Sequence, residues 1–169
     1  MKELGAEFEM VVRLLCKYFP NAEELIKPTL FHSIRVGTYL YEKGYKREVV
    51  IGGLLHDTLE DTALTEDGIK EKFGSEILML VKANTKDGTI ADKIEKRREL
   101  IERCAKTNED AAIIKAADII DNIRYFAWIN DIEHLNICRS NADLFSQNLP
   151  GGYSDKIFAE LKKSGVNNV

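Results

Sequence analysis

The chain has 169 residues, of which 44% are hydrophobic and 31% charged, and its formal net charge is -4. A chain of this length can bury one hydrophobic core, which predicts a single domain over residues 1–169. The acidic balance argues against nucleic acid as a partner, because backbone binding needs clustered basic charge. No run approaches the roughly 20 apolar residues that span a bilayer, and the N-terminal segment is too acidic for a secretory signal. We therefore expect a cytoplasmic protein that does not bind a membrane.

Apolar residues recur three and four positions apart along most of the chain, which predicts an all-α fold. We expect helices over 3–18, 29–43, 46–59, 64–74, 75–83, 91–106 and 108–128, a loop over 85–90, and two further helices on either side of Pro150. Thr29 and Asn108 are the expected N-caps, and Gly44 and Gly74 the expected helix ends. Asn21 and Glu24 could form a capping box.

The expected helix 46–59 carries the most hydrophobic run of the chain and also two adjacent glycines, Gly52 and Gly53. Glycine lowers helix propensity, so we expect this helix to pack closely against another backbone.

Three cysteines, Cys16, Cys104 and Cys138, are widely separated and form no Cys-x-x-Cys pair. They are expected to be reduced and mostly buried. His134 and Cys138 lie four residues apart and could share a helix face as two zinc ligands. No second pair of ligands is near, so a partly buried helix face is the alternative.

His56 and Asp57 end the most hydrophobic helix of the chain. Burying an imidazole and a carboxylate costs several kcal/mol unless a partner or a cation compensates. Glu60 and Asp61 follow one turn later, which brings three carboxylates within five residues. Such a group calls for a divalent metal, a cationic substrate group or a raised pKa; a solvated acidic helix end is the alternative.

Asp118 places a further carboxylate in an otherwise apolar helical stripe. Lys115 lies three residues before it and Asn122 four after it, on the same face, so a Lys115–Asp118 salt bridge is the simple structural role. His32, alone, would be a core or helix-end histidine. Together with the acidic group that follows His56, Asp118 and His32 become candidate metal ligands.

These residues resemble the HD-domain phosphohydrolases, whose pattern of a histidine, a His-Asp doublet and a later aspartate is matched by His32, His56, Asp57 and Asp118. More narrowly, GGLLHDTLEDT and IIKAADIIDNIR resemble the hydrolase domain of the bifunctional alarmone synthetase/hydrolases and their small relatives. The resemblance covers about residues 27 to 127 and leaves the expected C-terminal helices, 128–169, outside it. In that family a basic segment precedes the first histidine, and here this segment is reduced to LIKPTLFH. The Leu-His-Asn motif of the family is replaced here by Ile120, Asp121 and Asn122.

The resemblance implies a metal-dependent hydrolase that removes pyrophosphate from the 3′ position of guanosine tetra- or pentaphosphate. Two imidazoles and two carboxylates suit several divalent metals, and the family expectation is Mn²⁺. Glu60 and Asp61 match positions that the family uses for water activation. Asn122 matches a nucleotide contact, and the candidate phosphate-binding cations are Lys115, Arg124, Arg35 and Lys82.

The same ligand set could serve another nucleotide substrate, as in a 5′-nucleotidase, a dNTPase or a cyclic-nucleotide phosphodiesterase. The alternative outside the enzymes is a nucleotide sensor, which would bind its ligand without turnover. Glu60 and Asp61 favour an enzyme, because binding alone needs no water-activating pair. The sequence does not fix the oligomeric state.

Overall fold

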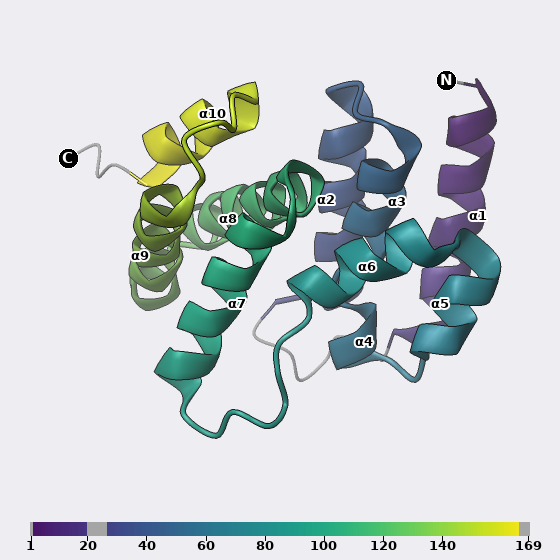
Figure 1. Cartoon of the computed structure of the whole chain (residues 1–169), viewed down its shortest axis with the longest axis horizontal. Coiled ribbons are helices and arrows are strands. Elements are labelled where there is room, and N and C mark those ends of the chain that lie inside the picture. Colours follow the sequence, from purple (N-terminus) through teal and green to yellow (C-terminus); the bar gives the residue numbers. More distant parts are fainter. Residues whose placement is uncertain (1, 20–26, 166–169) are drawn as a thin grey trace. The chain divides into compact units, whose positions relative to one another are not determined.

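The structure of the chain is a computed structural model that describes residues 2–19 and 27–165. It divides into two compact units, Met1–Thr85 and Lys86–Val169. Every regular element among the described residues is a helix, which confirms the all-α prediction (Figure 1). The expected capping box of Asn21 and Glu24 lies outside the described residues, and the single domain stays a prediction.

The first unit contains six helices in its described part. They are α1 (Lys2–Tyr18), α2 (Thr29–Glu42), α3 (Arg47–Leu55), α4 (Thr58–Asp61), α5 (Glu66–Phe73) and α6 (Ser75–Asn84). Helix α3 contacts α1, α2 and α6 and is buried along its apolar run from Val49 to Leu55. Its side chains join a core that also includes Val11, Leu15, Ile69 and Ile77. Since α3 leads directly into His56, this core fixes the position of the doublet.

Helices α2 and α3 approach each other through a reciprocal pair of glycine contacts. A Cβ atom added at Gly37 would lie 2.4 Å from Cγ and Cδ2 of Leu54, and one at Gly53 would lie 2.4 Å from Cδ1 of Leu40. Each glycine therefore makes room for a leucine of the other helix. The expected close approach at Gly53 is present, but against a side chain and not against a backbone.

The second unit contains α7 (Lys93–Thr107), α8 (Glu109–Trp128), α9 (Ile132–Asn148) and α10 (Lys156–Gly165). Helix α8 contacts α7, α9 and α10. Every residue from Ala111 to Ile120 is buried, including Lys115 and Asp118. Helix α8 is therefore the central element of this unit and carries its buried charges.

Several helix ends confirm the sequence predictions. The Asn108 side chain accepts a hydrogen bond from the Ala111 amide at the start of α8 (2.8 Å). Gly44 and Gly74 take positive φ angles of 78° and 95° after α2 and α5, a backbone region that favours glycine. Residues 85–90 form the expected non-helical connection.

The residue that caps α2 and the first residue of the charged helix differ from the predictions. Pro28, in an extended conformation, is the N-cap of α2, and Thr29 is its first helical residue with no capping hydrogen bond from its side chain. The charged helix begins at Lys93, because the Asp92 side chain accepts from the Glu95 amide at 2.7 Å and acts as its N-cap.

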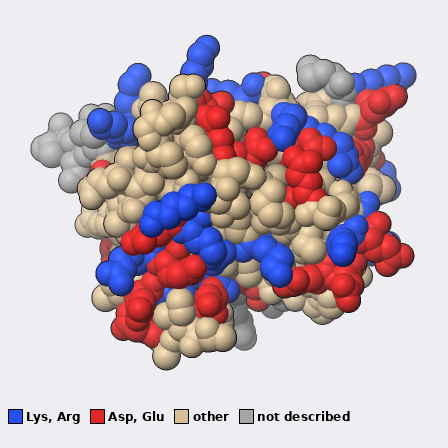
Figure 2. All heavy atoms as spheres, viewed as in Figure 1, with Lys and Arg blue, Asp and Glu red and all other residues tan. Residues whose placement is uncertain are grey.

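On the face shown in Figure 2, basic and acidic side chains are interspersed, with no broad field of one sign. None of the described helices is long and apolar enough to cross a membrane.

Candidate metal centre and active site

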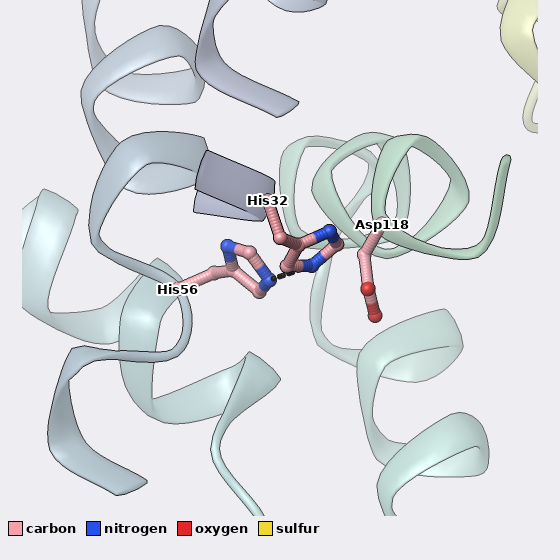
Figure 3. A group of neighbouring side chains, drawn as sticks. All are labelled: His32, His56 and Asp118. Carbon is pink, nitrogen blue, oxygen red and sulfur yellow. Dashed lines mark hydrogen bonds between the residues drawn. The ribbon is translucent and has the colours of Figure 1, made fainter. Parts of the chain in front are cut away.

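His32 and His56 face each other in the interior of the first unit. His32 lies in the first turn of α2, where its amide donates to the Pro28 carbonyl at 2.9 Å, and His56 directly follows α3. Neither residue has any exposed surface. Their Nε2 atoms are 3.2 Å apart, joined by the dashed line in Figure 3. The packing of α2 on α3 thus brings together two imidazoles that are 24 residues apart in the sequence.

The orientation of the His56 ring is set by its own helix. Its Nδ1 lies 2.8 Å from the Gly53 carbonyl oxygen. A carbonyl only accepts, so Nδ1 carries a proton, and in the neutral tautomer the Nε2 lone pair remains available to a metal ion. Metal-binding histidines are commonly held in this way, with the second ring nitrogen donating to a carbonyl.

The helix that carries His56 does not continue to residue 59 as predicted. It ends at Leu55, a turn follows at His56 and Asp57, and α4 begins at Thr58. The cause is local competition for backbone carbonyls: the buried Thr58 hydroxyl donates to the Leu55 carbonyl at 2.6 Å, and His56 takes that of Gly53. Thr58 is a site-shaping residue that the sequence reasoning missed; a hydroxyl directly after the doublet was the available signal.

Asp57 completes a compact group of three donor atoms. Its Oδ2 lies 3.2 Å from His56 Nε2 and 3.6 Å from His32 Nε2. Burial alone would raise the pKa of this carboxyl, but the charge and hydrogen bond of His56, with the charges of Lys27 and His32, hold the pKa well below its usual range.

The spacing of these donors suits a metal ion. Two nitrogens that each lie about 2.1 Å from one ion, at a right angle, are about 3.0 Å apart. The separations among the two imidazoles and the carboxylate, 3.2 to 3.6 Å, are slightly longer than that value, so one ion could contact all three atoms after small shifts. The described residues of the first unit therefore fit one face of a metal coordination sphere.

Glu60 and Asp61 lie on α4, immediately after this group. Both of their amides donate to the Asp57 carbonyl, at 3.1 and 3.0 Å. Glu60 is half-buried and Asp61 is exposed. Because the helix breaks after Leu55, Glu60 and Asp61 do not continue the helix that leads into His56, but the pair still follows the doublet within one turn.

Asp118, the third residue drawn in Figure 3, lies on α8 in the second unit. Both of its carboxylate oxygens have donors: Lys115 Nζ lies 2.8 Å from Oδ2, and Asn122 Nδ2 lies 2.5 Å from Oδ1. The Lys115–Asp118 ion pair that the spacing offered is therefore present, and it is buried. The two neighbours hold the carboxylate in one orientation.

The other candidate substrate contacts have partners within the chain. The guanidinium of Arg35 lies 4.7 Å from the ring centre of Phe31. Lys82 pairs with Glu66 at 2.8 Å, and both side chains are about half exposed. Arg124 pairs with Glu160 of α10 at 2.7 Å.

The zinc alternative at His134 and Cys138 receives no support from the structure. His134 Nδ1 pairs with Asp131 at 2.8 Å, and its ring stacks on Phe126. Cys138 is buried. Among the described residues, no group of three metal-binding side chains gathers around this pair.

The HD-domain family model matches residues 14–147. The chain belongs to the HD-domain family. This HD domain is 33% identical over 122 residues to a guanosine-3′,5′-bis(diphosphate) 3′-pyrophosphohydrolase of Aquifex aeolicus, covering 71% of this chain and 18% of that protein. It is 36% identical over 99 residues to the mouse enzyme named guanosine-3′,5′-bis(diphosphate) 3′-pyrophosphohydrolase MESH1, covering 57% of this chain and 55% of that protein. The chain thus spans less than a fifth of the first relative and about half of the second.

A solved structure extends the comparison to nearly the whole chain. It belongs to a metazoan ortholog of SpoT that is described as hydrolysing ppGpp. The two share 26% sequence identity with a TM-score of 0.78, over 94% of this HD domain and 93% of that chain. The fold predicted from helical periodicity is thereby confirmed as an HD-type fold.

Proposed function

We propose that the chain is a metal-dependent phosphohydrolase that removes pyrophosphate from the 3′ position of guanosine tetra- or pentaphosphate. The observation that carries the proposal is the group formed by the buried His32 and His56 and the partly exposed Asp57, whose donor atoms lie 3.2 to 3.6 Å apart. Membership of the HD-domain family supports a divalent metal there. The names of the relatives supply the substrate.

The proposed ligands are His32, His56, Asp57 and Asp118, and the proposed ion is Mn²⁺. A mixture of imidazole and carboxylate donors suits manganese among other divalent metals. When bound, the ion would polarise a phosphoryl oxygen and favour deprotonation of the attacking water. Asp118 is proposed as the fourth ligand because Lys115 and Asn122 hold its buried carboxylate in one orientation.

Within this proposal, residues of the chain accept the proton of the attacking water and bind the substrate. Glu60 and Asp61 orient the attacking water and accept its proton. The proposed phosphate contacts are Lys115, Arg124, Arg35 and Lys82, and Asn122 is the proposed contact to base or ribose. Arg124 and Lys82 would exchange their present carboxylate partners for phosphate. The partner is a small nucleotide in the cytoplasm.

The test is product analysis after incubation of the Mn²⁺-loaded chain with guanosine tetraphosphate and, separately, with a panel of nucleoside mono- and triphosphates and cyclic nucleotides. Release of pyrophosphate from guanosine tetraphosphate alone is expected. Cleavage of another nucleotide instead would keep the hydrolase and reject the substrate. Binding of guanosine tetraphosphate without turnover would reject the hydrolase and support a nucleotide sensor.

Two variants separate catalysis from metal binding. Glu60→Gln is expected to lower kcat by about 10² to 10⁴ while Mn²⁺ stays bound, because general-base catalysis contributes a factor of this size. Asp57→Asn is expected to lose Mn²⁺ affinity as well as activity. Glu71→Gln, at an exposed site on α5, is the matched control and should change neither. Full activity in Glu60→Gln would remove Glu60 from the mechanism.

A further inference from the structure

A groove of about 630 Å³ lies along α1 and the end of α5. Every residue that lines it belongs to the first unit, and none is a candidate site residue. On α1 the lining extends from Ala6 to Lys17, which corresponds to about 16 Å of helix. Small-molecule sites in proteins typically have volumes of about 300–1,000 Å³, so the groove has the size of a ligand pocket.

Its floor is apolar and flexible. Ala6, Met10 and Leu14 follow one another at intervals of four on the same face of α1, and Phe73 lies at the end of α5. Met10 is 52% exposed, although Val11 and Leu15 beside it are completely buried in the core. The unbranched thioether of methionine adapts its shape to irregular apolar partners. The floor therefore offers a hydrocarbon surface that the described residues leave uncovered.

The rim is basic. Arg13, Lys17 and Lys72 line the groove, against a single acidic residue, Glu9, which pairs with Arg13. Lys17 and Lys72 have no ion-pair partner among the described residues. Each stands in the last turn of its helix, where a cation also interacts favourably with the helix dipole. That interaction explains a cation at each helix end, but not why both line one apolar groove.

The lining also restricts the kind of anion. None of the described lining residues is a serine, threonine, asparagine, glutamine, tyrosine or histidine. Side-chain hydrogen bonds to a nucleobase or a sugar could therefore come only from Glu9 and the three cations of the lining, and Glu9 is already paired with Arg13. Phe73 is only 5% exposed and offers no open ring for stacking. What remains is a ligand with a plain hydrocarbon body and a charged end.

We propose that this groove binds an acyl chain with an anionic head group, a carboxylate or a phosphate. The hydrocarbon lies along Ala6, Met10 and Leu14, and the head group is held by Lys17 and Lys72. Charge-assisted contacts of this kind are the stronger hydrogen bonds in proteins, and the hydrocarbon adds affinity through its buried area. The proposal does not depend on the proposed hydrolase activity.

The test is isothermal titration of the full chain with decanoate and with decyl phosphate, both below their micelle-forming concentrations. Saturable binding of either probe at a stoichiometry of one is expected; binding of only one tells which head group is preferred. Decyltrimethylammonium, with the same chain and the opposite charge, should not bind. GTP and an acidic amphipathic helical peptide are tested in parallel.

The double variant Lys17→Gln, Lys72→Gln is expected to bind about tenfold more weakly, since two charge-assisted contacts are lost. Its control is Lys2→Gln, Lys70→Gln, which removes two exposed lysines from the same two helices outside the groove. Met10→Gln should also weaken binding, while Ile94→Gln, at a residue 76% exposed on α7, should not. All six substitutions lie on exposed positions, so the variants are expected to fold.

Three results would overturn the proposal: no binding of either anion up to about 1 mM, equal binding of the ammonium probe, or unchanged affinity in the double lysine variant. Tighter binding of GTP or of the acidic peptide would also overturn it, and would assign the groove to a nucleotide or to a protein helix.

Discussion

Replacing Gly37 by alanine tests whether the contact between α2 and α3 positions the two histidines. The added Cβ atom would lie 2.4 Å from both Cγ and Cδ2 of Leu54, a distance that non-bonded carbon atoms do not tolerate. Leu54 is completely buried, so it has no open space into which to move. The two helices must separate or the leucine must leave its preferred rotamer.

The size of the effect follows from two opposing contributions. Overpacking of a core typically destabilises by about 1–3 kcal/mol, and a clash with a branch carbon belongs at the upper end. Alanine gains about 1 kcal/mol over glycine in helix propensity. The net loss for Gly37→Ala is therefore about 2 kcal/mol. Gly53→Ala should cost less, because its 2.4 Å contact is with only one terminal methyl group, Cδ1 of Leu40.

The assay is urea unfolding followed by helical circular dichroism, with Mn²⁺ titration of the folded variants. Gly88→Ala is the control, since a Cβ atom there meets nothing within 4 Å. The double variant Gly37→Ala, Leu54→Ala should lose less stability than the sum of the single variants, because the clash disappears with the leucine. Additive losses, or Mn²⁺ affinity that is unchanged in Gly37→Ala, would refute the reasoning.

Three further predictions concern buried and paired groups. Lys115→Met should destabilise the metal-free chain by about 3–5 kcal/mol in urea unfolding, because it leaves the buried Asp118 carboxylate without its cation. Lys115→Arg should recover part of the loss. A loss under 1 kcal/mol in Lys115→Met would contradict a stabilising role for the buried ion pair. Burial raises the pKa of the Cys104 thiol to about 12 from 9.0, so the folded state binds the thiol proton more tightly than the unfolded state does. The stability that this proton contributes is complete below pH 9.0 and is lost as the pH rises towards 12. Cys104→Ala should lack that decline, and a thiol reagent at pH 8 should modify exposed Cys16 long before Cys104. Arg124→Gln should raise KM several-fold while Glu160→Gln does not, although both break the same surface pair; equal effects of the two substitutions would mean that Arg124 has only its structural role.

Sequence periodicity predicted the longer helices well because each of them buries an apolar face, whereas the short α4 buries only Thr58 and was not predicted as a separate helix. It also predicted features that depend on near neighbours, such as the Asn108 cap, the glycine ends and the Lys115–Asp118 ion pair. These depend on contacts within one or two turns, which spacing alone determines.

The features that the sequence did not reveal depend on competition or on distant contacts. The helix break after Leu55 occurs because Thr58 and His56 take carbonyls that a continuous helix would use. The approach of His32 to His56 requires the packing of Gly37 on Leu54, and the pairing of Arg124 with Glu160 joins residues 36 apart. The residue types of the candidate site could be predicted, but the geometry of the turn that presents them could not.

The hydrogen bond from His56 Nδ1 to the Gly53 carbonyl affects what the presence of this histidine indicates in related chains. The imidazole contributes to the shape of its own turn, so selection for folding would preserve it even in a chain that no longer turns over a substrate. Retention of this histidine in a descendant is therefore weak evidence of catalysis. Loss of Glu60 or Asp61, whose side chains lie at the more exposed end of the segment, would be the more informative sign that a chain had become a binding protein.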